Sequence, residues 1–172
     1  NLRKIFAPVI SRLYLENNFC ELKNLYQKTT FILNVLTIPL GIIIVLFSDE
    51  ILSIFSSNND LLEYKSYLIV IMISRIISLL AGNSGAFMVM AGLEKKELKI
   101  QSFKAIIVII LALIFVERYE LLAVVVLYIL SMISINIAQL FHINKKLKFT
   151  PFSKPLLKLI VVSIPLLIFS IL

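Results

Sequence analysis

Tryptophan is absent from this sequence of 172 residues, and cysteine and histidine each occur once, as Cys20 and His142. A single cysteine cannot form an internal disulfide, and no Cys/His cluster indicates a metal site. Four glycines and five prolines exclude a collagen-like, low-complexity or disordered chain. No P-loop and no GxSxG, HExxH or CxxC pattern occurs, so the sequence indicates neither an enzyme nor a cofactor.

Hydrophobic residues, by contrast, make up 60% of the chain. A soluble domain of this length has too little interior to bury so much apolar surface, which indicates a membrane protein. The formal net charge is +7, but the basic residues lie in short segments between apolar runs. That placement is typical of membrane topology, and we expect no nucleic-acid partner.

Five apolar runs predict the fold class. A bilayer core about 30 Å thick is crossed by roughly 20 helical residues, and the runs approach that length. The alternating segments of about ten residues that a β-barrel requires do not occur. We therefore expect an all-α fold, a polytopic bundle of about five transmembrane helices. The runs are 31–47, 67–90, 100–116, 121–141 and 156–172.

The segment before the first run mixes charged and apolar residues at helical spacing, which predicts an amphipathic helix at the membrane surface. Pro8 is expected to break the helix upstream of it. The predicted organisation is thus an amphipathic segment (1–28), four transmembrane helices (29–142), and a basic loop with a truncated further helix (143–172). Because the chain starts at Asn1 without a leader and stops inside an apolar run, we expect a fragment of a longer membrane protein.

Lysine and arginine alternate strongly between the segments that join these runs. The segment before residue 31, the loop at 91–99 and the loop at 142–155 are rich in them, whereas Lys65 and Arg118 stand alone in the other two loops. The positive-inside rule therefore places the amino end and the two basic loops in the cytoplasm. The "AGLEKKELK" segment at 91–99 is expected to be a solvated turn, and none of the five runs contains a carboxylate.

Three of the runs carry polar residues on one helical face. At about 100° per residue, these groups span faces of roughly 60°, 100° and 80° on the three helices. The run at 100–116 is nearly all aliphatic, and we expect it to face lipid. The faces hold Thr30, Asn34, Thr37, Gly41 and Ser48; Tyr67, Ser74, Arg75, Ser78, Gly82 and Gly85; and Tyr128, Ser131, Gln139 and His142.

Two interpretations of these faces stay open. Small and hydroxylated residues let helices approach and share hydrogen bonds. Alternatively, the faces line a water-filled cavity, which Arg75 favours because intramembrane ions usually mark pathways. Arg75 could instead pair with an acid on a missing segment or extend toward the outer surface. In the cavity interpretation the substrate-binding residues are Arg75, Asn34, Thr37, Ser78 and Gln139.

An unpaired guanidinium in such a cavity attracts an anion. Phosphate and pyrophosphate groups form bidentate hydrogen bonds with guanidinium, and a low dielectric strengthens them. The charge alone does not distinguish a lipid-linked sugar from a carboxylate drug or a nucleotide.

The stretch from Phe6 to Phe55 resembles the carboxy-terminal half of polysaccharide flippases of the O-antigen type, which belong to the multidrug/oligosaccharidyl-lipid/polysaccharide exporter superfamily. The matching features are "PVIS" at 8–11, the charged helix ending "ELKNLYQK", an apolar span around Pro39, "SDEILSIF" and the later "AGLEKK" turn. One departure is "VERYELLAVVVLYIL", which has no glycine where many relatives are Gly-rich.

The resemblance implies two six-helix lobes around a central cavity, of which this chain is part of the second. It also implies that the protein flips an undecaprenyl-pyrophosphate-linked oligosaccharide across the bacterial cytoplasmic membrane by alternating access, with H+ or Na+ as a coupling ion. Three competing functions stay open. They are a multidrug or cation antiporter of the same superfamily, which should carry an intramembrane carboxylate; a non-transporting assembly subunit, whose polar faces should meet without a cavity; and a polymerase with large outer loops.

Overall fold

The computed structural model describes residues 2–55 and 60–171, with side chains described from Phe6 to Ile168 outside that gap. Asn1 and Leu172, the two ends of the predicted segments, lie outside the described residues. Every regular element of the described chain is helical, which confirms the all-α membrane fold class. The elements are α1 (Leu2–Leu15), α2 (Phe19–Leu46), α3 (Ser48–Phe55), the 3-10 helix η1 (Asp60–Tyr64), α4 (Lys65–Leu79), α5 (Ser84–Met90), α6 (Glu94–Leu147) and α7 (Lys154–Ile171).

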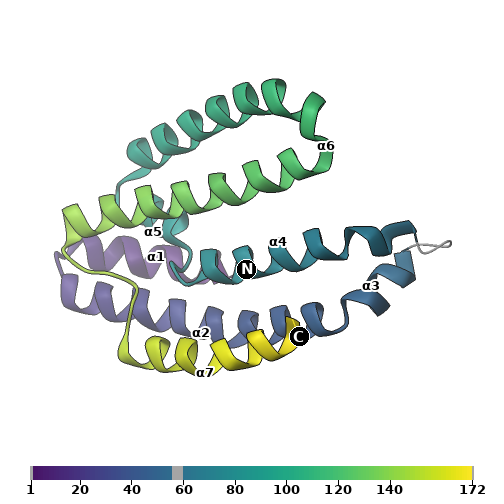
Figure 1. The fold of residues 1–172 in the computed structure, drawn as a ribbon. Helices are drawn as coiled ribbons and strands as arrows, with labels where there is room; N and C mark the ends of the chain where they lie inside the picture. Colours follow the sequence, from purple (N-terminus) through teal and green to yellow (C-terminus); the bar gives the residue numbers. More distant parts are fainter. Residues whose placement is uncertain (1, 56–59, 172) are drawn as a thin grey trace.

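Three helical stretches are long and apolar enough to cross a membrane, namely α2, the segment Asp60–Met90, and α6. The last of these is a hairpin, because Glu120 has non-helical backbone angles (φ 44°, ψ −124°) and reverses the chain. Figure 1 shows its outgoing arm (94–119) and its returning arm (121–147) running in opposite directions. At a 1.5 Å rise per residue each arm is about 40 Å long, so each can span a bilayer.

The connections fall into two groups at opposite ends of the bundle. The α1–α2 connection, the segment before α6 and the α6–α7 connection lie at one end, and η1 and the turn at Glu120 lie at the other (Figure 1). We call the first group the basic end, because it carries most of the lysines and arginines. That the basic end faces the cytoplasm stays a prediction from the charge pattern.

The predicted break at Pro8 is wrong, since Pro8 lies inside α1 and is exposed. The chain breaks instead at residues 16–18, where Asn17 has a positive φ of 55° and Asn18 caps α2 by accepting a hydrogen bond from the backbone N–H of Glu21. Asparagine tolerates the left-handed conformation and is a favoured N-cap, so these two residues turn the chain. The second half of the predicted amphipathic segment, from residue 19 onward, therefore continues directly into the first span as α2.

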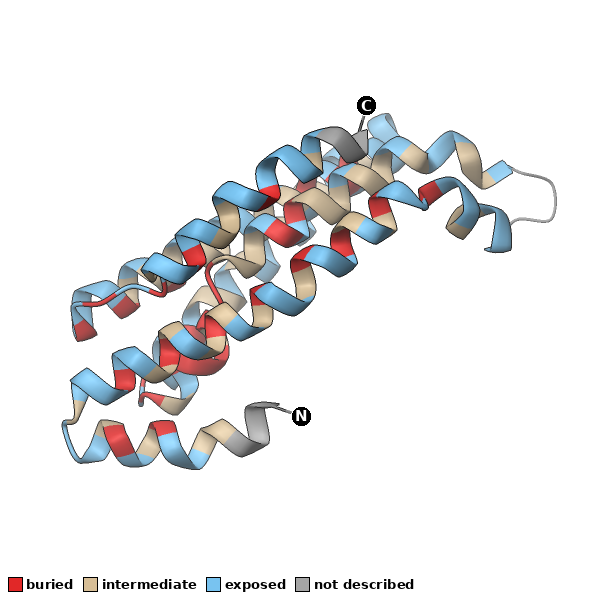
Figure 2. Ribbon diagram, turned by 90° about the horizontal axis from the view of Figure 1, so that it is seen from below, coloured by how far each residue is buried: buried red, intermediate tan, exposed pale blue. Residues whose placement is uncertain are grey.

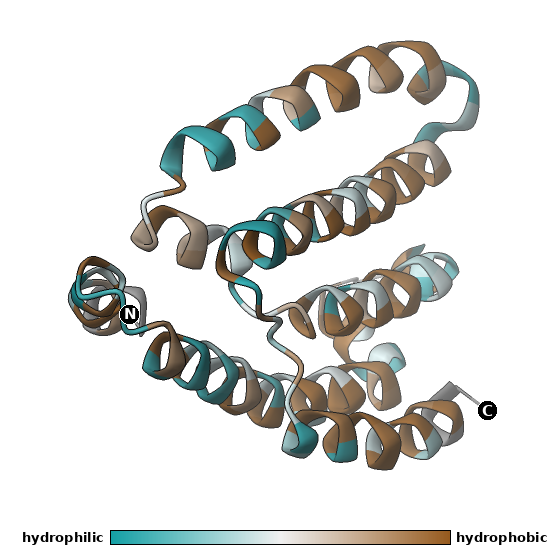
Figure 3. Cartoon of the chain, turned by 90° about the vertical axis from the view of Figure 1, so that its left-hand side faces the viewer, coloured by the Kyte–Doolittle hydropathy of each residue, from teal (hydrophilic) through white to brown (hydrophobic). Residues whose placement is uncertain are grey.

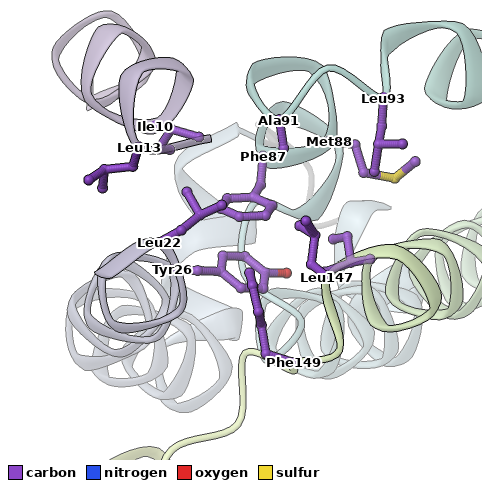
Figure 4. Packing of buried hydrophobic residues seen from close by; sticks show 11 residues of the cluster. Ile10, Leu13, Leu22, Tyr26, Phe87, Met88, Ala91, Leu93, Leu147 and Phe149 are labelled. Carbon is purple, nitrogen blue, oxygen red and sulfur yellow. The ribbon is translucent and has the colours of Figure 1, made fainter. Parts of the chain in front are cut away.

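The main hydrophobic core of the described chain lies at the basic end (Figure 4). There the Tyr26 ring of α2 stacks on the Phe87 ring of α5, with centroids 4.2 Å apart, and Phe149 packs beside both. Ile10 and Leu13 of α1 join the same cluster. This core anchors α1, α5 and the end of α6 to the beginning of α2.

Away from the core, the helices expose long apolar faces (Figures 2 and 3). On the outgoing arm of α6 the exposed residues include Phe103, Ile106, Leu113 and Ile114. Such continuous apolar exposure is characteristic of surfaces that contact lipid or another membrane-embedded protein segment. That the run at 100–116 faces lipid stays a prediction.

Candidate functional site

The second predicted span, 67–90, is a broken helix. Helix α4 ends at Leu79, and α5 begins at Ser84 after a connection in which Gly82 has a φ of +69°. A β-carbon on Gly82 would lie 2.2 Å from Thr30 Oγ1, so glycine is required here both for its conformation and for the close approach of α2. Non-helical backbone at membrane depth persists only where its polar groups find partners.

Helix α2 supplies those partners. The side-chain amide of Asn34 donates to the carbonyl of Leu79 at 2.9 Å and to that of Thr30 at 2.8 Å. The hydroxyl of Tyr26 donates to the carbonyl of Ala81 at 2.8 Å. Carbonyls freed at the end of α4 are thereby satisfied in a region without water. The polar face predicted for the first span thus packs against the broken helix.

A cavity of about 690 Å³ lies on the other side of the break. Its walls come from α4, the connection after it, α5 and both arms of α6, and Leu33 of α2 also reaches the lining. The polar and charged residues of the lining are Arg75, Ser78, Asn83, Ser84, Glu97, Gln101, Lys104, Tyr128, Ser131, Asn136 and Gln139. A cavity of this volume can hold a small polar molecule or the headgroup of a larger one.

Arg75 projects from α4 into this cavity and is exposed. Within residues 2–55 and 60–171, no ion pair, hydrogen bond or ring contact involves its guanidinium. Three residues later, Ser78 accepts a hydrogen bond of 2.6 Å from the side-chain amide of Asn136, which joins α4 to the returning arm of α6. Arg75 is therefore an unpaired cation on a cavity wall where the neighbouring Ser78 is hydrogen-bonded to another helix.

Glu97 corrects the prediction of a solvated turn at 91–99. It lies in the first turn of α6 and is only 7% exposed. Its Oε1 accepts hydrogen bonds from Gln101 and Gln139, both at 2.8 Å, whereas its Oε2 is buried and has no partner among the described residues. Gly85 permits this arrangement, since a β-carbon there would lie 2.7 Å from Glu97 Oε1. Helix α6 begins at Glu94, before the apolar run at 100–116, so Glu97 lies in a helix that packs against the rest of the bundle and is buried there.

The structure brings three of the five predicted site residues, Arg75, Ser78 and Gln139, to one cavity. Asn34 and Thr37 do not line it. Asn34 is fully buried against the end of α4, and the hydroxyl of Thr37 donates to the carbonyl of Leu33 in its own helix.

Sequence reasoning misses Glu97, Gln101, Lys104 and Asn136 as lining residues. The first three recur at intervals of four and three, which places them on one face of the outgoing arm. That signal is present in the sequence but overlaps the segment that its charges predict to be a loop. His142, grouped with Gln139 by the same periodicity, does not line the cavity, and its Nδ1 lies 2.8 Å from the carbonyl oxygen of Ala138.

Apolar helices around a polar cavity beside a broken span are characteristic of one class of protein, the multi-pass membrane transporters. A family model described as MatE matches residues 6–114, well over half of the sequence, and the chain belongs to this family. MatE members are membrane transporters of the multidrug/oligosaccharidyl-lipid/polysaccharide exporter superfamily, not enzymes. Searches of curated proteins and of solved structures gave no match.

Proposed function

We propose that this protein is a flippase that moves an undecaprenyl-pyrophosphate-linked oligosaccharide across the bacterial cytoplasmic membrane for assembly of a surface polysaccharide such as O-antigen. The observation that carries the proposal is the unpaired guanidinium of Arg75 in a polar cavity between apolar helices. A cation held at membrane depth without a counter-ion is costly, and an anionic substrate offsets that cost each time it binds.

The lining supports an amphiphile with an anionic and hydroxyl-rich headgroup. The guanidinium can form two parallel hydrogen bonds with a phosphate group. Ser78, Tyr128 and Ser131 lie on the same cavity and carry hydroxyl groups that can bind sugar hydroxyls, and Gln139 lies beside them with its side-chain N–H donating to Glu97. The apolar outer faces of the helices stay in contact with lipid, where a prenyl chain remains during transfer of the headgroup.

In the proposed mechanism this chain forms part of the second of two lobes, which rock around the cavity and expose it to each side in turn. Residues 29–142 are the membrane part of this lobe, residues 1–28 cover its cytoplasmic end, and residues 143–172 lead into a further helix. A gradient of H+ or Na+ is the proposed driving force. The proposed substrate site leaves out Asn34 and Thr37, because neither of them lines the cavity.

The proposal is tested with Arg75→Ala in the full-length protein. We expect loss of surface glycan at unchanged protein level, because the headgroup loses its cation. Arg75→Lys should retain part of the activity, since it keeps the charge but not the planar fork. Arg118→Ala is the matched control, because it removes an exposed arginine beside the turn at Glu120, outside the cavity lining. Normal glycan in the Arg75→Ala strain would refute the assignment.

A cation antiporter is the second candidate, and Glu97 is the observation that favours it. The five apolar runs of the sequence contain no carboxylate, yet this acid, which lies just before the third run, is buried at the cavity with one oxygen unpartnered. A cation or proton would satisfy that oxygen. An antiporter predicts that the full-length protein lowers accumulation of ethidium in a drug-sensitive host, that Glu97→Gln abolishes this effect and that Arg75→Ala preserves it. Unchanged ethidium accumulation with the wild-type protein would remove this candidate.

A non-transporting subunit and a polymerase receive less support. A non-transporting subunit predicts that the polar faces meet without a cavity, but Arg75, Ser78 and Gln139 line one of about 690 Å³. A polymerase should carry large outer loops, but the hairpin of α6 reverses at Glu120 with no separate loop element, and the described residues of the other outer connection form only the short helices α3 and η1.

A further inference from the structure

We propose that Lys104 and Arg75 together form a two-point anion site that recognises a diphosphate group in preference to a monophosphate. The proposal deepens the function proposed above and rests on it for the identity of the natural substrate. Whether the site binds a diphosphate is a separate question that can be tested directly.

Lys104 occupies an unusual position for a lysine. It is half-buried on the outgoing arm of α6, inside the apolar run at 100–116, and it lines the same cavity as Arg75. In the described part of the chain its ammonium group takes part in no ion pair or hydrogen bond. Like Arg75, it is a cation placed at membrane depth without a counter-ion, which is costly unless a ligand supplies one.

Two hydrogen bonds indicate that both cations lie at a similar depth. Asn136 bonds to Ser78, and α4 and the returning arm run in the same direction (Figure 1), so Arg75 is level with residue 133. Gln139 bonds to Glu97, and the two arms of α6 run in opposite directions, so Lys104 is level with residue 132. At 1.5 Å per residue, Arg75 and Lys104 therefore lie within about one helical turn of each other along the bundle.

The two cations approach this level from different walls, because Arg75 belongs to α4 and Lys104 to the outgoing arm. Glu97 is the one carboxylate among the lining residues, and it precedes Lys104 by seven positions, which is about 10 Å along the helix. Its Oε1 is already held by Gln101 and Gln139. The level that Arg75 and Lys104 share is therefore positively charged.

An anion with two charged centres fits this arrangement better than one with a single centre. The planar guanidinium binds one phosphate through two parallel hydrogen bonds, and the ammonium group acts as a point charge for the second. A monophosphate can contact one cation fully but leaves the other uncompensated. A diphosphate neutralises both, so the pair distinguishes between the two ligands.

The test is calorimetric titration of the purified full-length protein in detergent with inorganic pyrophosphate and, separately, with orthophosphate at equal ionic strength. We expect pyrophosphate to bind about tenfold more tightly, the effect of one further charge-assisted contact. Lys104→Met should weaken pyrophosphate binding about tenfold and leave orthophosphate binding nearly unchanged. Lys99→Met is the matched control, since Lys99 is exposed on the same arm and does not line the cavity.

Lys104→Arg keeps the charge and should retain the preference for pyrophosphate, which also shows that position 104 tolerates substitution. Equal affinities of the wild-type protein for the two anions, or equal losses in Lys104→Met and Lys99→Met, would overturn the two-point site. Failure of the proposed function looks different: pyrophosphate preference would persist while Arg75→Ala cells make normal surface glycan.

Discussion

Two polar helix faces in this protein are similar in sequence but differ in their surroundings. The face of α2, with Thr30 and Asn34, is buried against the broken span formed by α4 and α5. The face of α4, with Arg75 and Ser78, lines a cavity. Each face carries polar residues at helical spacing, but only the face of α4 also carries a long cation, Arg75. The difference is that α2 meets a backbone with free carbonyls, whereas α4 meets open space.

The comparison shows that a polar helix face in the sequence predicts a polar partner, but it does not predict whether that partner is backbone or water. Backbone exposed by a helix break and water in a cavity both satisfy side-chain amides and hydroxyls. Long cations are different, because no backbone group nearby can neutralise them. The structure accordingly places Arg75 and Lys104 on the cavity and Asn34 on the break. Substitutions on the two faces should therefore affect different properties, namely stability for α2 and ligand binding for the cavity.

The largest expected effect is that of Gly82→Ala, which should destabilise the bundle by about 3 kcal/mol. The β-carbon would be placed at a φ of +69° and 2.2 Å from Thr30 Oγ1. The measurement is the apparent melting temperature of the full-length protein in detergent, monitored by size-exclusion chromatography of heated samples.

The double variant Gly82→Ala/Thr30→Ala serves as its control. It removes the steric clash but keeps the strained backbone, so part of the lost stability should return. A Gly82→Ala protein as stable as wild type would mean that α2 does not approach the break as closely as described.

Asn34→Ala should have the next largest effect on stability, a loss of about 1–2 kcal/mol, because the carbonyl of Leu79 loses its buried donor. Pyrophosphate affinity, measured on the folded fraction, should not change, because Asn34 does not line the cavity. A fall in affinity without a fall in stability would reverse the distinction drawn between the two faces.

Thr37→Val is the matched control on α2 and should give the smallest effect, below about 0.5 kcal/mol. The hydroxyl of Thr37 only donates to the carbonyl of Leu33, which is already part of the same helix. A loss as large as that of Asn34→Ala would show that the stability of this face does not depend on capping the break.

The coarse architecture can be predicted from the sequence. Apolar runs of bilayer length predict the helical membrane fold, and helical periodicity groups Arg75 with Ser78, which both line a cavity with Gln139. Those signals are local and periodic, so they survive without knowledge of tertiary contacts.

The break after Leu79 could not be predicted in the same way. The surrounding residues are small and no proline marks the position. Gly82, Asn83 and Ser84 are compatible with a turn, but the continuous apolar run at 67–90 predicts a single span. The break is stabilised by Thr30, which approaches Gly82, and by Asn34, which bonds to the carbonyl of Leu79, and both lie about fifty positions earlier in the chain. The burial of Glu97 likewise depends on Gly85 and Gln139, from two other segments.

The contacts between α2 and the broken span have a consequence for motion. Asn34 is bonded to Leu79, Tyr26 to Ala81, and Thr30 touches Gly82, so these two segments are fastened at three successive levels. Segments joined in this way move as one rigid unit. The arms of α6 have fewer hydrogen bonds to this unit, chiefly the one between Asn136 and Ser78, although the end of the returning arm packs into the core at the basic end. Any opening and closing of the cavity should therefore pivot the arms of α6 about that core, and the bond between Asn136 and Ser78 should break first.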